Sequence, residues 1–220
     1  MGAIFKKEER STLVMRVAYQ IREAIKSGKL QPGDRLIETD LANEMQISRH
    51  PIREAIRYLE KEGLVTTTPF KGAKVATFSE ADLEEFYTLR IALEELAIRT
   101  LVKRLDRNKI LKLQTALKEM KLLAVKGELK QYVNADLAFH RRICELCGHR
   151  RLLQLWQTLE PQMGLFVMFA NKPYHPETPL VIYQEHLRVY EAIKAGDADR
   201  AVDLMKSVLD NGYKFASCKN

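Results

Sequence analysis

The 220-residue sequence has no long apolar run and few cysteines, and both features exclude certain classes of protein. No segment approaches the roughly 18 apolar residues of a membrane-spanning helix. The first ten residues lack the apolar core of a secretory signal peptide, so we expect a cytoplasmic protein with no membrane partner. Cys144 and Cys147 form a C-x-x-C pair, but no second pair completes a tetrahedral zinc site. We therefore interpret both cysteines as structural residues of a helix.

Positive charge is modest and unevenly distributed. The net charge is +7, of which residues 1–78 carry +4 and the longer remainder carries only +3. A DNA-binding surface needs such an excess of Lys and Arg, so the N-terminal part is the better candidate. Strand-like alternation disappears after residue 78, and glycines then stand mainly at expected helix ends. These shifts predict two domains, 1–78 and 79–220.

The segment 48–65 reads as a capped basic helix followed by the start of a strand. Ser48 is a good N-cap because its hydroxyl can accept a backbone N–H, and Pro51 is tolerated in a first turn. Gly63 ends the helix. Apolar and basic side chains repeat at helical spacing on different faces: Ile52, Ala55, Ile56 and Leu59 on one, Arg49, Arg53 and Arg57 on the other. Such a helix suits the major groove of DNA.

The flanking segments complete a winged helix-turn-helix. Residues 13–27 and 38–45 have the periodicity of an amphipathic helix and a short second helix. Residues 65–68 and 73–77 predict the two strands of a hairpin, with the turn at 69–72. A helix, a turn, a recognition helix and a hairpin make the winged variant of this motif.

This pattern resembles the DNA-binding domain of GntR-family transcription regulators. The resemblance is carried by Ala24-Ile25, Gly28-Lys29-Leu30-Gln31-Pro32-Gly33, Leu41-Ala42, Ile47-Ser48-Arg49, Pro51-Ile52-Arg53-Glu54-Ala55 and Glu62-Gly63-Leu64-Val65. It implies DNA contacts at Thr39, Ser48, Arg49, His50, Arg53, Lys71 and Gly72. Many relatives have Thr where this chain has His50, so its base preference is expected to differ. The alternative is a helix-turn-helix that contacts protein.

The sequence after residue 78 predicts six or seven helices in an antiparallel bundle, so the fold class is mainly α. Ser79 and Asp82 match a capping box. We expect helices near 80–104, 109–125, 129–147, 150–170, 180–195 and 197–214. Pro161 should bend the fourth, Asp197 should cap the last, and three prolines predict a loop over 171–179.

This half is similar to the all-helical FCD effector domain of the fatty-acid-regulator-like GntR branch, through Arg90-Ile91-Ala92-Leu93-Glu94, Asp136-Leu137-Ala138-Phe139-His140-Arg141 and Glu185-His186. Asp136 and His140 share one helix face, and with His186 they could hold a divalent metal such as zinc with open positions. The family's third histidine falls at Val208, which donates no lone pair. Asn211, one turn on, is a candidate substitute. A plain hydrogen bond between Asp136 and His140 is the alternative.

Arg90 lies on an otherwise inward-facing stripe of its helix. A guanidinium that faces a core needs an anion, and the candidates are Glu94, one turn on, and an organic-acid effector. Apolar side chains that could wall an effector pocket, although each also suits a plain core, are Phe86, Tyr87, Trp156, Met163, Phe166 and Phe169. We expect effector contacts from Arg90, Asp136, His140 and His186.

Together these patterns predict a transcription regulator, expected to repress, that is controlled by a small carboxylate effector. One recognition helix covers too few base pairs for genomic specificity, so we expect a homodimer on an inverted-repeat operator. A metal-dependent enzyme built on Asp136, His140 and His186 is an alternative, but no general base or nucleophile accompanies these residues. A constitutive DNA-binding protein with a purely structural bundle is a third, and inward-facing charges argue against it.

Overall fold

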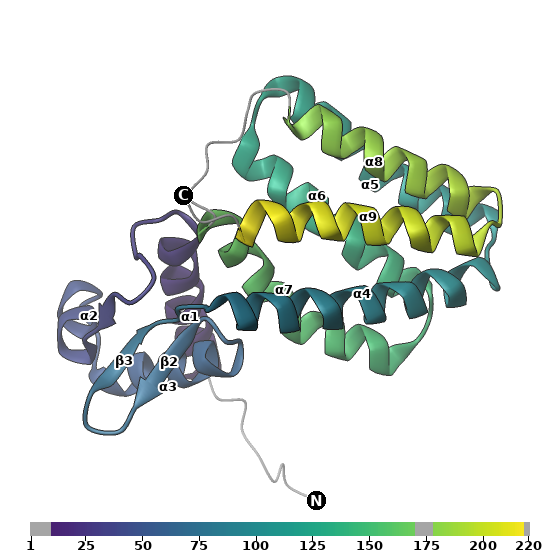
Figure 1. Ribbon diagram of the computed structural model, residues 1–220. Helices are drawn as coiled ribbons and strands as arrows, with labels where there is room; N and C mark the ends of the chain where they lie inside the picture. Colours follow the sequence, from purple (N-terminus) through teal and green to yellow (C-terminus); the bar gives the residue numbers. More distant parts are fainter. Residues whose placement is uncertain (1–9, 170–177, 218–220) are drawn as a thin grey trace, which may run out of the picture. The chain divides into compact units, whose positions relative to one another are not determined.

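The computed structural model describes residues 10–169 and 178–217. The chain forms two compact units that divide between Thr77 and Phe78 (Figure 1). Both are mostly helical, and the first also contains a small sheet, in agreement with the mainly α fold class.

The N-terminal unit is a winged helix-turn-helix. Its elements are α1 (Arg10–Lys26), β1 (Arg35–Leu36), α2 (Glu38–Glu44), α3 (Arg49–Lys61), β2 (Val65–Thr68) and β3 (Gly72–Val75). The sheet is antiparallel in the order β1-β3-β2, with Val65 opposite Val75 and Thr68 opposite Gly72. The predicted hairpin is present, although β3 ends at Val75 and not at Thr77. The two-residue strand β1 was not predicted.

Packing of α1 on α3 fixes the orientation of the recognition helix. Ile21 and Ile25 of α1 and Ile52 and Leu59 of α3 are fully buried, and burial of such a side chain contributes about 1.5–3 kcal/mol. Because the apolar face of α3 is held inward, its arginine face must point to solvent.

The C-terminal unit is a helical bundle. Its described elements are α4 (Glu80–Val102), α5 (Arg107–Lys126), α6 (Leu129–Leu146), α7 (Arg150–Phe169), α8 (Thr178–Lys194) and α9 (Ala198–Ser217). The Ser79–Asp82 capping box forms, and Asp197 accepts a hydrogen bond from the Arg200 N–H, as predicted for a cap. Pro161 lies inside α7.

The prediction of a loop that extends to Pro179 was wrong. Helix α8 begins at Thr178, so Pro179 lies in its first turn and not in a loop. Proline needs no N–H partner there and its fixed φ suits the helix. Residues 171–177, which include His175 and the rest of the expected loop, lie outside the described residues.

The bundle encloses a continuous apolar core, to which α4, α6, α8 and α9 all contribute. Helix α4 packs on α9, α5 on α6 and α8 on α9 (Figure 1). The core includes Trp156, Phe139 and Leu101, all fully buried. The buried polar or charged residues in the described part of the chain are Arg90, Glu94, His140 and His186. All four belong to the C-terminal unit, where they mark a candidate site.

Candidate functional site

The exposed face of α3 carries the residues expected to contact DNA. Arg49, His50 and Arg53 are exposed, and so is Thr39 on α2. Ser48 occupies the N-cap position as predicted, but its hydroxyl makes no capping hydrogen bond. The cap prediction was therefore right in position and wrong in contact.

Glu38, the first residue of α2, holds the two arginines together. Its carboxylate accepts from Arg53 Nη2 at 2.9 Å and from Arg49 Nη2 at 3.2 Å. The hydrogen bond from Arg53 lowers the pKa of Glu38, burial opposes it, and the bond from Arg49 lowers it further. Sequence reasoning missed Glu38 because the contact depends on how α2 meets α3. The carboxylate orients both guanidinium groups on a face where they remain 57% and 50% exposed.

The wing has a sharp, exposed tip. Phe70 and Gly72 have φ angles of 64° and 82°, in the left-handed region that favours glycine. Lys71, between them, is exposed, and the Phe70 side chain is fully exposed. A cation beside a protruding ring fits contact with a nucleic-acid backbone.

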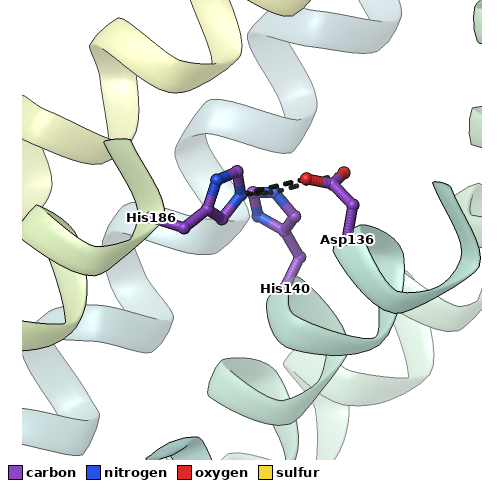
Figure 2. Close-up of side chains that lie close together, drawn as sticks. All are labelled: Asp136, His140 and His186. Atoms are coloured by element: carbon purple, nitrogen blue, oxygen red, sulfur yellow. Dashed lines mark hydrogen bonds and ion pairs between the residues drawn. The ribbon is translucent and has the colours of Figure 1, made fainter. Parts of the chain in front are cut away.

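In the C-terminal unit, Asp136 and His140 of α6 meet His186 of α8 (Figure 2). His186 Nε2 lies 3.0 Å from His140 Nε2 and 3.2 Å from Asp136 Oδ1. His140 Nε2 lies 3.9 Å from Asp136 Oδ2. Both imidazoles are buried, whereas Asp136 is partly exposed. Asp136 and His140 thus lie on one face of α6, as their spacing predicts. The packing of α8 against α6 brings His186 to the same place.

The other nitrogen of each ring is held by an acceptor. His140 Nδ1 lies 2.6 Å from Glu94 Oε2, and His186 Nδ1 lies 2.8 Å from the Ile182 carbonyl oxygen. A carbonyl oxygen only accepts, so Nδ1 of His186 carries a proton. Burial lowers the pKa of His186, which favours the neutral ring. The Nε2 atoms of the two rings face each other and Asp136, and a neutral imidazole that is protonated at Nδ1 can offer its Nε2 lone pair to a metal.

This donor set fits a divalent metal. Zinc–nitrogen bonds of about 2.0–2.1 Å place neighbouring ligand atoms about 2.8–3.4 Å apart in octahedral or tetrahedral geometry. Two of the three separations in the cluster fall in that range. Metal-binding histidines also characteristically donate their second N–H to a carboxylate or a carbonyl, as Glu94 and Ile182 allow here.

Arg90 contacts the same network from α4. Its Nε donates to Glu94 Oε1 at 2.7 Å. Glu94 is one of the two anions that the sequence offered as partners of Arg90, the other being an organic-acid effector. Arg90 Nη2 has no hydrogen-bond partner among the described residues, although the side chain is buried. Burial alone raises the pKa of Glu94, but the charges of His140 and Arg90 and their hydrogen bonds together lower it to about 2. A buried carboxylate thus links the guanidinium to a histidine of the cluster.

A cavity of about 310 Å³ lies over this network. Arg90, Asp136, His140 and His186 line it together with residues of α4, α6, α7, α8 and α9: Tyr87, Tyr132, Val133, Leu137, Met163, Thr178, Val181, Ile182, Glu185, Val208, Leu209, Asn211 and Gly212. Its size is at the lower end for small-molecule sites. Tyr87 and Met163 thus line the cavity as the sequence allowed. Phe86, Trp156 and Phe166 are core residues outside it, and the Phe169 side chain lies outside the described residues.

Comparisons with known proteins agree with this architecture. The model of bacterial regulatory proteins of the gntR family matches residues 13–75, and the FCD domain model matches residues 85–211. The chain belongs to the GntR family and carries an FCD domain. The predicted resemblance is therefore confirmed.

Relatives of this GntR regulator include proteins of similar length. The uncharacterized HTH-type transcriptional regulator YdhC of Bacillus subtilis is 28% identical over 90% of this chain and 88% of its own. The gluconate operon transcriptional repressor of the same organism is 31% identical over 72% of this chain and 65% of its own. The crystal structure of a GntR regulator from Rhodococcus sp. RHA1 has the same fold, with a TM-score of 0.80, 23% identity and coverage of 95% and 100%.

These relatives are regulators of transcription, and the chain is a GntR transcription regulator rather than an enzyme. This comparison contradicts the alternative that the chain is a metal-dependent enzyme. In the described part of the regulator, every helix is too short or too polar to span a bilayer.

Cys144 and Cys147 are buried in the core of the FCD domain, and burial raises the pKa of both thiols.

Proposed function

We propose that this GntR regulator is a metal-dependent, carboxylate-responsive repressor. The observation that carries the proposal is the combination of an unpartnered Arg90 nitrogen and three converging metal donors on one cavity wall. A structural bundle gains nothing from a buried polar atom without a partner, because such an atom costs about 1–3 kcal/mol. A ligand carboxylate would supply the missing acceptor.

Metal binding is assigned to Asp136, His140 and His186. A bound divalent ion would supply open positions that attract carboxylate oxygens. Val208 offers no fourth protein ligand. Asn211 donates its amide N–H to Glu185 Oε1 at 3.0 Å, and its amide oxygen as a substitute ligand stays a prediction. With three protein ligands, the remaining coordination positions are open to water or the effector.

The effector is a small carboxylate that contacts Arg90 and the metal cluster. Arg90 Nη2 donates to one carboxylate oxygen, and charge-assisted bonds of this kind are about twice as strong as neutral ones. Because Arg90 belongs to α4 and the cluster to α6 and α8, one ligand would bridge three helices. Binding could therefore favour one packing of these helices over another.

DNA binding is assigned to the N-terminal unit. Arg49 and Arg53 would contact base edges, with Thr39, Ser48 and His50 nearby and Lys71 and Gly72 of the wing on the DNA backbone. Their exposure on α2, α3 and the wing tip supports this assignment. One relative is named as an operon repressor, which supports repression as the outcome.

A homodimer would read the two halves of an inverted repeat. Support comes from an exposed apolar stripe on α4, where Leu89 and Leu96 are 49% and 45% exposed, and from Leu155 on the adjacent α7, which is 56% exposed. Leu89 and Leu96 are seven residues apart and share a helix face. Exposed apolar patches often mark subunit interfaces.

Thermal unfolding tests the proposal. We expect zinc to raise the melting temperature of EDTA-treated protein, and small carboxylates to raise it further. The His186→Ala variant should lose the zinc response. The Arg90→Lys variant should keep it and lose most of the carboxylate response, because lysine has a single nitrogen and cannot bond Glu94 and the ligand from two separate nitrogens, as Nε and Nη2 of arginine would. A wild-type protein that responds to neither zinc nor any carboxylate contradicts the proposal.

A further inference from the structure

The cavity contains a second polar pair that neither the metal cluster nor Arg90 uses. Glu185 of α8 and Asn211 of α9 both line it. Asn211 Nδ2 donates to Glu185 Oε1 at 3.0 Å, a bond that joins the two helices. The pair keeps free acceptor capacity, since Glu185 Oε2 and Asn211 Oδ1 both accept hydrogen bonds. It is therefore a site for a hydrogen-bond donor.

Glu185 also forms no close ion pair within the described residues, although the charge of Arg188, one turn on in α8, acts on it. Within residues 10–169 and 178–217, Asn211 makes its hydrogen bond and no Lys, Arg or His forms an ion pair with it. Glu185 is partly buried, so water covers its carboxyl only in part. Apart from the metal cluster, Arg90 and Glu185 are the charged side chains of the described cavity wall, and Glu94 already balances Arg90.

We infer that the effector is a carboxylate that also carries a hydrogen-bond donor, an ammonium or a hydroxyl group, which binds the Glu185–Asn211 pair. This inference rests on the proposed function, because Arg90 and the metal cluster hold the carboxylate. An unsubstituted carboxylate of the same length would displace water from the acceptor pair without donating a hydrogen bond in its place. A substituted one replaces the lost water contact with a direct bond.

The size of the preference follows from the kind of bond. Hydrogen bonds to charged groups correspond to about 10- to 100-fold in affinity. Sites built to bind a donor reject analogues that lack it, because the acceptors are left unpaired. Glu185 is only partly buried, so we expect an affinity difference at the lower end of this range, about tenfold.

Calorimetry on the zinc-loaded full chain tests this with matched acids. The panel contains butanoate, 4-aminobutanoate and 4-hydroxybutanoate, and the corresponding five- and six-carbon sets with the substituent at each position. At least one amino or hydroxy acid should bind about tenfold tighter than the plain acid of its length. Glu185→Ala should remove that preference. Glu185→Gln, which keeps an acceptor but not the charge, should reduce it for an ammonium and retain it for a hydroxyl.

Glu191→Gln is the matched control, because Glu191 is an exposed residue of the same helix that pairs with Lys194 outside the cavity. It should leave every affinity unchanged. If plain acids bind as tightly as their substituted partners, or if the preference survives Glu185→Ala, this inference is wrong and the proposed function stands. If no carboxylate binds the zinc-loaded wild type, both are wrong.

Discussion

Replacing Glu94 by alanine should strongly destabilise the C-terminal unit. Glu94 is fully buried and accepts hydrogen bonds from Arg90 Nε at 2.7 Å and His140 Nδ1 at 2.6 Å. Because its pKa is lowered to about 2, it is ionised at neutral pH. Its loss would leave the Arg90 guanidinium, itself only 6% exposed, without an adjacent counter-charge. Removing one partner of a buried pair costs about 3–5 kcal/mol.

Urea unfolding at neutral pH in the presence of EDTA measures this change without metal linkage. Trp156 is the single tryptophan and is buried in the C-terminal core, so its fluorescence reports on that unit alone. The matched control is Glu95→Ala, which removes the neighbouring carboxylate and its partly exposed pairs with Arg99 and Lys206. Surface pairs are worth about 0–1 kcal/mol. Equal losses in the two variants would refute the reasoning.

Three further predictions concern the DNA face, the dimer and the capping box. Arg49→Ala should cost about 1–3 kcal/mol of sequence discrimination in a gel shift. Lys112→Ala on α5 should cost none. Equal effects of the two substitutions would count against the assignment of Arg49 to base contacts. Leu96→Glu should give monomers by light scattering, while Leu122→Glu, on an exposed face of α5, should stay dimeric; a Leu96→Glu dimer would move the interface elsewhere. Asp82 has its pKa lowered below the usual 3.8 by the N-cap serine hydroxyl and backbone N–H. Its stabilisation is therefore present above about pH 5 and lost as pH falls through the lower folded pKa, so the difference in unfolding free energy between wild type and Asp82→Asn should shrink with acid. A difference that is constant from pH 7 to pH 3 would contradict that origin.

Local patterns predicted most of the helices and the hairpin, because helical periodicity and capping act over a few residues. The stripe of Ile52 and Leu59 and the Ser79–Asp82 box are both of this kind. The strand β1 escaped prediction because two residues carry no periodicity, and it forms only by pairing with β3. Pro179 was assigned to a loop because it is the last of three closely spaced prolines, although proline also suits the first turn of a helix.

The candidate site was predictable only in part. Asp136 and His140 are four residues apart and could be paired from spacing, and Glu94 could be paired with Arg90 for the same reason. The bond from Glu94 to His140 spans 46 residues of sequence and depends on how α4 packs against α6. The contacts of Glu38 with the arginines and of Glu185 with Asn211 likewise join different helices. Sequence spacing gives no information on such contacts.

Operator affinity measured with and without ligand tests the central claim most directly. The measurement is fluorescence anisotropy on a DNA site selected in vitro with the zinc-loaded protein, using the tightest carboxylate of the panel. Saturating ligand should change the wild-type dissociation constant by about 5- to 150-fold, the usual range of allosteric coupling. The same ligand concentration should leave the His140→Ala and Arg90→Lys affinities unchanged, since both variants lack a ligand contact. An unchanged wild-type affinity, or an equal change in all three proteins, would contradict control of DNA binding from this cavity.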